Sequence, residues 1–256
     1  MPAVKLQQPA LPDRSRKLAK NSPTQGATMR ENKQNLVDSR QDTLQRAYGI
    51  RFEGKTHYRT KVWQVLAPFI CQWTPVAGNV LDLGSGYCEF INNVKAGKKY
   101  AMDLNPDVHH RAAEGVVIFQ QDCSEPWPLA EGELDAVFTS NFLEHLPNKD
   151  LVLATLADAY RCLKPGGTFI SMGPNIKYVP GAYWDFFDHY VQLTELSLAE
   201  ALKMCGFEME KVVGRFLPYT MSDGRQYPLW MLQWYLAFPA VWPIFGKQFL
   251  VIARKP

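Results

Sequence analysis

Two glycines and two acidic residues lie close together between residues 79 and 90, in the sequence Asn-Val-Leu-Asp-Leu-Gly-Ser-Gly-Tyr-Cys-Glu-Phe. The apolar run before Gly84 suits a buried parallel strand, and the residues after Gly86 are compatible with a helix. Gly84 and Gly86, with Ser85 between them, permit positive φ and let a ligand approach the backbone. The spacing predicts a strand, a tight turn and a helix that bind a nucleotide-like ligand, although an ordinary strand-to-helix turn can look the same.

Charge narrows the choice of ligand. Glu89 occupies the third-glycine position of a dinucleotide-binding G-x-G-x-x-G motif, and Asp82 precedes the first glycine by two residues. These carboxylates would repel a pyrophosphate, which disfavours a nicotinamide oxidoreductase. They suit a cationic ligand such as S-adenosylmethionine, which carries an ammonium and a sulfonium. The Asp-x-Gly-x-Gly turn resembles motif I of the class I S-adenosylmethionine-dependent methyltransferases, except that Cys88 stands where a third glycine is common.

Two further acids follow predicted strands. Asp103 ends a predicted strand over residues 99–103, about twenty residues after the first strand, where such folds place a ribose-binding carboxylate. The resemblance implies that Leu104 flanks the adenine. It also implies that Asp122 accepts from the adenine amino group and that the backbone N–H of Cys123 donates to a ring nitrogen. An aspartate after a strand can also simply cap a turn.

A fourth predicted strand, residues 134–139, runs into Ser-Asn-Phe-Leu-Glu-His-Leu at residues 140–146. This segment resembles motif IV of the small-molecule methyltransferases grouped with the ubiquinone-biosynthesis type (methyltransferase type 11). Asn141 would lie at the carboxyl end of the strand, where open α/β sheets bind ligands. The segment lacks the Asn/Asp-Pro-Pro-aromatic signature of enzymes that methylate nucleic-acid bases, which disfavours base methylation.

Glu144 and His145 raise the question of a metal, because some relatives bind a divalent cation through Glu-x-x-Glu-His. Here the first of those positions is Asn141, a neutral amide, and we therefore expect no metal. His145 is a candidate general base for an acceptor hydroxyl, since an unperturbed histidine titrates at a pKa of about 6.5. The alternative is a histidine that fixes the loop to the helix beneath it.

The segment 173–192 is long and rich in aromatic and titratable residues, which predicts the acceptor-binding surface. Tyr183, Trp184 and Tyr190 are the candidate substrate contacts. Asp188 and His189 are candidates to orient or deprotonate an acceptor hydroxyl. Aromatic packing over a helix is the alternative explanation of the same residues.

The remaining pattern predicts an α/β fold with a Rossmann-like, mostly parallel sheet and helices on both faces. A helix over 151–163 stops at Lys-Pro-Gly-Gly (164–167), and a strand over 168–172 follows. A capping box at 197–200 opens another helix. Strands over 207–216 and 248–253 would form the antiparallel edge that distinguishes methyltransferases from dehydrogenases.

Composition divides the 256-residue chain into a flexible basic tail (1–41) and one methyltransferase domain (42–256). The domain would begin with lid helices (42–73) that break at 49–54, and residues 217–247 form an aromatic-rich insertion. The net charge of +3 is too small to argue for nucleic acid. Five cysteines without a Cys-x-x-Cys pair favour reduced thiols and a cytoplasmic protein without structural zinc.

The insertion could cap the domain, form a hydrophobic acceptor pocket or meet lipid with its tryptophans and tyrosines. Its most apolar part, 228–245, is interrupted by Gln233, Pro239 and Pro243, which disfavours a transmembrane helix but allows peripheral membrane contact. The sequence leaves the oligomeric state open.

The sequence therefore predicts methyl transfer from S-adenosylmethionine to an oxygen or nitrogen of a small-molecule, sugar, glycan or lipid-linked acceptor. Two alternatives remain at this point. One is a non-catalytic S-adenosylmethionine-binding or scaffold protein. The other is a protein or RNA methyltransferase that uses the basic tail.

Overall fold

The computed structural model describes residues 23–52, 54–75, 77–219 and 226–256. By the contacts between its residues, the chain divides into two units, residues 1–40 and residues 41–256. In the first unit, the described residues 23–40 belong to helix α1 (Pro23–Phe52). The composition predicted a flexible tail up to residue 41, and its first 22 residues lie outside the described part. From Pro23 the structure instead has a helix, because Gln, Arg, Lys, Glu, Met and Ala favour helical backbone even where little apolar surface is available to bury.

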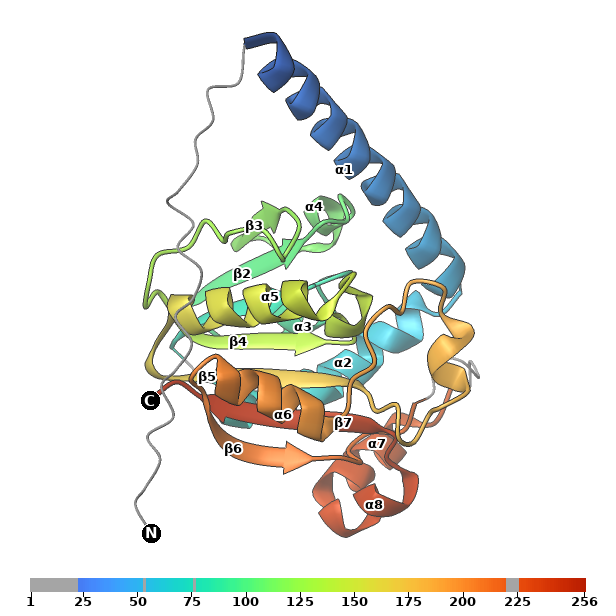
Figure 1. Ribbon diagram of the computed structural model, residues 1–256. Helices are drawn as coiled ribbons and strands as arrows, with labels where there is room; N and C mark the ends of the chain where they lie inside the picture. Colours follow the sequence, from blue (N-terminus) through green and yellow to red (C-terminus); the bar gives the residue numbers. More distant parts are fainter. Residues whose placement is uncertain (1–22, 53, 76, 220–225) are drawn as a thin grey trace, which may run out of the picture. The chain divides into compact units, whose positions relative to one another are not determined.

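The second unit is built on a seven-stranded sheet of order β3-β2-β1-β4-β5-β7-β6 (Figure 1). Neighbouring strands are parallel from β3 to β5, whereas β7 is antiparallel to both β5 and β6. This arrangement confirms the predicted Rossmann-like sheet with an antiparallel edge. The strands are β1 (Asn79–Leu83), β2 (Lys98–Asp103), β3 (Val116–Gln120), β4 (Leu134–Ser140), β5 (Leu163–Pro174), β6 (Glu208–Val213) and β7 (Gln248–Arg254).

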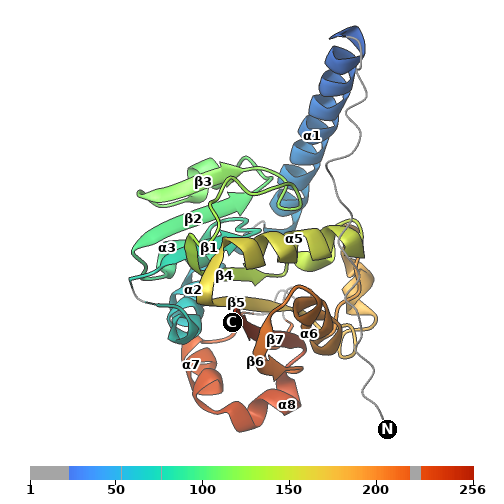
Figure 2. The ribbon, with the colours of Figure 1, turned by 60° about the vertical axis from the view of Figure 1, so that its left-hand side comes forward.

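Helices cover both faces of the sheet (Figures 1 and 2). On one face lie α5 (Lys149–Cys162) and α6 (Glu195–Met204), and on the other lie α2 (Thr56–Ile70), α3 (Glu89–Asn93) and α7 (Leu229–Ala237). Each face has its own apolar core, since alternate side chains of every strand point to opposite sides. The central strands β1 and β4 are apolar on both faces for this reason.

The shorter helices complete the domain. They are η1 (Cys71–Trp73), α4 (Val108–Arg111), η2 (Leu143–His145), η3 (Ala182–Asp185), η4 (Pro239–Val241) and α8 (Trp242–Phe245). The carboxyl end of β4 leads directly into η2, and the carboxyl end of β1 leads into the glycine turn. Because β1 and β4 are parallel neighbours, both segments meet at the same edge of the sheet.

Two predicted helix boundaries are wrong. The capping box lies one turn earlier than predicted: Thr194 caps α6, its hydroxyl accepts from the Ser197 N–H at 3.1 Å, and the Thr194 N–H donates back to the Ser197 hydroxyl at 2.9 Å. In the lid region, Gly49 lies within α1, which ends at Phe52, and α2 begins at Thr56, so the chain does not leave the helix at Gly49 as predicted. A helix interior tolerates one glycine at a cost of about 1 kcal/mol when its neighbours pack.

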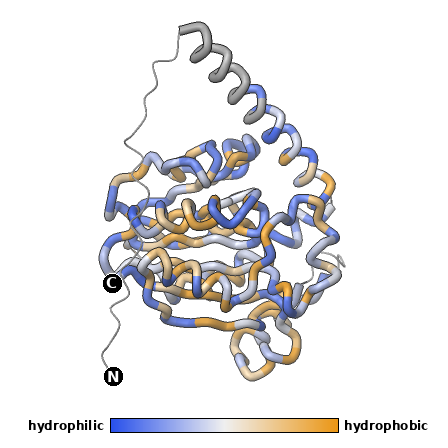
Figure 3. The backbone as a smooth tube through the Cα atoms, in the orientation of Figure 1, coloured by the Kyte–Doolittle hydropathy of each residue, from blue (hydrophilic) through white to orange (hydrophobic). Residues whose placement is uncertain are grey.

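The aromatic insertion forms α7, η4 and α8. It packs on the sheet face through buried Leu236 and Trp242, and the Tyr58 hydroxyl of α2 donates to the Tyr227 carbonyl at 3.0 Å. Trp230 and Trp234, in contrast, are more than half exposed. Figure 3 shows this region as a mixture of orange and pale stretches. Part of the insertion therefore caps the domain, which is one of the three roles that the sequence left open, and part presents apolar surface. Within the described residues, the structure contains no helix of the length and apolarity that a membrane crossing requires.

Candidate active site

The glycine turn after β1 has the backbone that the sequence predicted. Gly84 and Gly86 have φ angles of 66° and 51°, in the region that disfavours residues with a side chain. A Cβ at Gly84 would collide with the ring of Phe142, and one at Gly86 would stand 3.0 Å from the ring of Tyr48. The turn therefore forms a glycine cradle, meaning a backbone turn that leaves room for a ligand because neither Gly84 nor Gly86 has a side chain.

Two carboxylates support this turn from within the fold. Asp82 accepts from the Ile91 N–H at 3.3 Å, and Asp103 accepts from the N–H groups of Gly86 at 2.7 Å and Asn105 at 2.8 Å. Burial raises the pKa of Asp82 to about 8 and also raises the pKa of Asp103, since removal from water disfavours the charged form. A cationic ligand at the turn would favour the ionised form of Asp82.

Residues from the end of α1 and the start of α2 cover the turn. The rings of Tyr48, Phe52 and Tyr87 lie 5.3–5.5 Å apart, centroid to centroid. Arg59 donates to both carboxylate oxygens of Glu89, at 2.9 and 2.5 Å, and its guanidinium lies 3.9 Å from the centre of the Phe52 ring. Glu89, which the sequence placed next to the cofactor, is thus paired with Arg59. Such a pair can meet a ligand that carries both an ammonium and a carboxylate.

On the opposite side, η2 meets the loop that follows η3. The Nδ1 of His145 lies 2.9 Å from the carbonyl oxygen of Asp188 and 3.3 Å from its carboxylate. Arg51 of α1 also pairs with the Asp188 carboxylate. The imidazole rings of His145 and His189 lie 4.7 Å apart at 72°. The three predicted catalytic residues, His145, Asp188 and His189, are therefore brought together by the fold.

These contacts raise the pKa of His145 and lower the pKa values of Asp188 and His189. Burial opposes the charging of His145, but its hydrogen bond to Asp188 and the nearby charge of Glu144 outweigh this effect and raise its pKa. Burial would also raise the pKa of Asp188, which His145 and Arg51 instead hold well below the usual range. Burial and the positive charge of His145 lower the pKa of His189 to about 4, so His189 is neutral at pH 7.

One cavity extends from the glycine turn to the side of the site that holds His145 and His189. Of the predicted site residues, Asp82, Gly84, Ser85, Gly86, Asn141, His145 and His189 line it. Asn141 has a φ angle of 50°, and its side-chain amide donates to the Ser140 hydroxyl at 2.9 Å. Glu144 lines the cavity as well. The parallel pairing of β1 with β4 explains why segments sixty residues apart share this cavity.

The predicted adenosine contacts do not line the cavity in this structure. Asp103 lies directly behind the turn, while Asp122 accepts from the backbone and hydroxyl of Ser124 at 3.0 and 2.7 Å. Cys123 and Leu104 are buried. Asp103 therefore has the predicted proximity to the turn, and its contact with a ribose, like the adenine roles of the other three residues, stays a prediction.

The predicted substrate aromatics also lie outside the cavity lining. Tyr183 is fully buried and donates its hydroxyl to the Val191 carbonyl, while Trp184 and Tyr190 are about half exposed. Packing over the loop is thus the role that the structure gives Tyr183. The aromatic residues that do line the acceptor side are Phe186 and Tyr219. Alternation of exposed and buried rings along an irregular loop has no fixed period, so the sequence could not separate them.

Sequence reasoning also missed Tyr48, Arg51, Phe52, Trp63 and Phe138 in the cavity lining. The first three come from the end of α1, and no motif marks them. An Arg and two aromatics within five residues, inside the predicted lid region 42–73, were the only signal in the sequence.

The family comparison decides among the possible occupants of this cavity. A family model described as a methyltransferase domain matches residues 56–212, more than half of the chain. This chain belongs to the methyltransferase-domain family. No curated protein matches the sequence at a significant level.

Solved structures share the fold. A S-adenosylmethionine-dependent methyltransferase from Archaeoglobus fulgidus superposes with a TM-score of 0.59 at 19% identity, over 77% of this chain and 94% of the other. A possible histamine N-methyltransferase from Thermotoga maritima gives 0.59 at 17% identity, over 83% and 100%. The [4+2]-cyclase SpnF gives 0.54 at 16% identity, over 75% and 80%.

The site agrees with this membership. The open glycine cradle, the buried Asp82 and the Arg59–Glu89 pair are donors and acceptors that fit the amino-acid end of S-adenosylmethionine. The chain is a S-adenosylmethionine-dependent methyltransferase, with S-adenosylmethionine as its cofactor.

Proposed function

We propose that this methyltransferase acts on an oxygen or nitrogen of a small-molecule, sugar, glycan or lipid-linked acceptor. The observation that supports this most is the single cavity that joins the glycine turn to Glu144, His145 and His189. An acceptor atom placed beside these three side chains would face the cofactor end of the same cavity. Positioning of two reactants in one water-poor site can supply much of the rate.

The residues that would hold the cofactor are Asp82, the turn from Gly84 to Gly86, and Asn141. S-adenosylmethionine, when bound there, supplies an electrophilic methyl on its sulfonium, which an acceptor lone pair takes as the carbon–sulfur bond breaks to leave neutral S-adenosylhomocysteine. Tyr48 and Phe52 line that end of the cavity, where their rings would keep water away from a bound cofactor. Exclusion of water favours a step in which charge disappears.

The acceptor side would orient the attacking group. Asp188 holds the Nδ1 side of His145, and Arg51 holds Asp188 from the other direction. This chain of contacts fixes the His145 ring in one orientation, so that its second nitrogen and the ring of His189 are presented to the cavity. In our proposal this group of side chains faces the hydroxyl or amine of the acceptor and favours the loss of its proton.

Exposed aromatics support an apolar or lipid-linked acceptor. Phe187, next to Asp188, is 98% exposed, and Phe186 lines the cavity beside it. Trp230 and Trp234 present further aromatic surface on α7. Tryptophan and phenylalanine on a surface are typical of contact with a lipid headgroup region. We propose that the protein works in the cytoplasm, with residues 228–245 at a membrane surface.

A label-transfer experiment tests this proposal. The purified chain is incubated with methyl-tritiated S-adenosylmethionine and cell extract separated into lipid, water-soluble small-molecule, protein and RNA fractions. We expect the label in the lipid or small-molecule fraction. Label in protein or RNA would contradict the proposed acceptor class and favour the alternative that uses the basic tail. Binding of S-adenosylhomocysteine without transfer to any fraction would favour a non-catalytic binding protein.

A further inference from the structure

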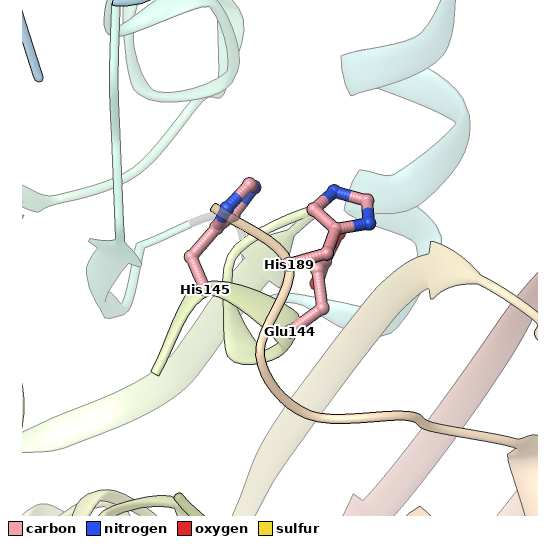
Figure 4. Close-up of side chains that lie close together, drawn as sticks. All are labelled: Glu144, His145 and His189. Atoms are coloured by element: carbon pink, nitrogen blue, oxygen red, sulfur yellow. The ribbon is translucent and has the colours of Figure 1, made fainter. Parts of the chain in front are cut away.

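Three potential metal ligands converge at the acceptor side (Figure 4). Glu144 and His145 come from η2, and His189 comes from the loop that follows η3. One ligand atom of each side chain lies within 4.8 Å of the other two. In Figure 4 the two imidazole rings lie side by side at a steep angle, and the Glu144 side chain rises behind His189.

The backbone holds this group in place. The Glu144 carbonyl accepts from the N–H groups of Tyr190 at 2.8 Å and Val191 at 3.1 Å, which fixes the loop against η2. His189 therefore cannot move away from Glu144 without breaking two backbone hydrogen bonds. The group is thus built by two segments, around Glu144 and His189, that lie 45 residues apart in the sequence and are joined by backbone hydrogen bonds.

Two atoms of the group are buried without a hydrogen-bond partner. They are Oε1 of Glu144, whose residue is 1% exposed, and Nδ1 of His189, whose residue is 6% exposed. A buried polar atom that is left unpaired destabilises the folded protein, because it loses its hydrogen bonds to water without replacement. Oε1 of an ionised Glu144 carries a lone pair, and so does Nδ1 of a neutral His189 whose proton is on Nε2. In these forms the partner that both atoms lack is a hydrogen-bond donor or a cation.

The surroundings of His145 are those of a metal-binding histidine. Its Nδ1 faces both the carbonyl and the carboxylate of Asp188, so Nδ1 carries the proton and the lone pair of Nε2 is left for another partner. Histidines that bind metals almost always donate their other ring N–H to a carboxylate or carbonyl in this way. Arg51 in turn holds Asp188.

We propose that Glu144, His145 and His189 bind a divalent transition-metal cation of the Zn²⁺, Mn²⁺ or Co²⁺ type. Two imidazoles and one carboxylate favour these ions over Mg²⁺ and Ca²⁺, which prefer oxygen ligands alone. Ligand–metal bonds of about 2.0–2.2 Å place ligand atoms about 3–4 Å apart, so small side-chain rotations suffice to close the group.

The structure supplies a ligand that the sequence motif lacked. Among residues 141, 144 and 145 alone, the neutral Asn141 leaves one anionic ligand missing. His189, which no sequence spacing connects to them, supplies the third ligand. Because one carboxylate balances only half of the charge of the cation, the bound ion would keep a net positive charge facing the cavity. It would attract an oxygen of the acceptor.

The cation site stands on the ligand geometry, whereas its role in methyl transfer rests on the proposed function. A bound cation would hold the acceptor oxygen and make its proton more acidic, and the proton would leave to water because both histidines are occupied. The oxygen lone pair would then form the new bond to the methyl carbon while the bond from that carbon to sulfur breaks.

Metal binding can be measured without an acceptor. The full-length chain, stripped with a chelator, is titrated with Zn²⁺, Mn²⁺, Co²⁺ and Mg²⁺ by calorimetry, and Co²⁺ binding is followed by its visible spectrum. We expect one ion per chain for Zn²⁺ or Co²⁺, a Co²⁺ spectrum of four or five ligands, and binding to Mg²⁺ that is at least tenfold weaker.

Variants locate the ion. His189→Ala and the isosteric Glu144→Gln should each weaken Zn²⁺ binding by about 100-fold or more, whereas Asp188→Asn should weaken it by about tenfold. His109→Ala is the control, because His109 is exposed and bonded to Gln120 away from the cavity. Equal Zn²⁺ affinity in wild type and Glu144→Gln, or no binding by wild type, would overturn the proposal.

A second measurement separates this proposal from the proposed function. Affinity for S-adenosylhomocysteine should stay within about threefold of wild type in Glu144→Gln, since the glycine turn is untouched. Loss of metal with retained cofactor affinity supports the site even if no acceptor is found. Tritium transfer that proceeds unchanged in the presence of chelator would overturn the role of the cation but leave methyl transfer intact.

Discussion

The two halves of the active site are built in different ways. The cofactor half, defined by Asp82, Gly84, Ser85, Gly86 and Glu89, comes from eight consecutive residues. The acceptor half, defined by Arg51, Glu144, His145, Asp188 and His189, is gathered from α1, η2 and the loop after η3. In the first, backbone conformation makes the site. In the second, side-chain contacts between separate elements make it.

This difference predicts how each half responds to change. The cofactor half depends on φ angles and close approach, so a single added methyl group should disrupt it. The acceptor half depends on several pairwise contacts, so a single change should loosen it without destroying the fold. The following predictions test that contrast.

The largest effect should come from Gly84→Ala. Its φ of 66° disfavours alanine, and the new Cβ would meet the Phe142 ring, so we expect a loss of about 2–5 kcal/mol of unfolding free energy and more than tenfold of S-adenosylhomocysteine affinity. Gly132→Ala is the matched control: it has the same φ but nothing within 4 Å, and should lose only about 1 kcal/mol. Urea unfolding and calorimetry measure both. Equal losses in the two variants would show that contact with Phe142 does not matter.

Asp82 should make stability depend on pH. Its pKa is about 8 in the folded protein and near 3.9 in the unfolded chain, so the folded state binds the proton more tightly and stability falls as pH rises from about 4 to about 8. Without cofactor we expect a loss on the order of a few kcal/mol between pH 5 and pH 8.5, and Asp82→Asn should remove most of it.

Asp135→Asn is the control for this pH dependence. Burial opposes ionisation of Asp135, but its contacts with Lys164 and the Asn79 N–H lower its pKa, so its stabilising effect is lost only below the pH range of the experiment. The measurement is the unfolding midpoint of wild type, Asp82→Asn and Asp135→Asn at pH 5 and pH 8.5. A slope that survives in Asp82→Asn would assign the effect to another group.

Arg51→Met should have a moderate effect confined to the acceptor half. It leaves the Asp188 carboxylate, whose side chain is 22% exposed, without its arginine, and we expect a cost of about 1–2 kcal/mol with S-adenosylhomocysteine affinity unchanged. Arg254→Met breaks a more exposed pair with Glu210 and should cost less than about 1 kcal/mol. A large loss of cofactor affinity in Arg51→Met would mean that the two halves are not separable.

The smallest effect should come from replacing the basic residues of the predicted tail (1–41). Replacement of Lys5, Arg14, Arg16, Lys17 and Lys20 by glutamine should change tritium transfer less than twofold, since the residues that line the cavity lie between 48 and 219. Loss of transfer would show that a third region contributes to acceptor binding, as expected for a polyanionic acceptor.

The cofactor turn could be predicted residue by residue because its determinants are local. Two glycines at alternate positions after an apolar run allow few backbone conformations, and the structure has the strand, turn and helix that the sequence predicted. The proximity of Asp103 to the turn followed from the geometry of adjacent parallel strands. The substrate aromatics could not be sorted in this way, because Tyr183 and Phe186 differ only in how an irregular loop folds.

By itself, the sequence determined the fold, the family and the cofactor, because short motifs with fixed backbone requirements and apolar periodicity carry that information. Only the tertiary structure decided which side chains face the acceptor. Arg51, Glu144 and His189 lie 45 to 138 residues apart, and nothing in their spacing reveals contact. They meet because β1 and β4 end at the same edge of a parallel sheet and two backbone hydrogen bonds hold the loop of His189 against η2.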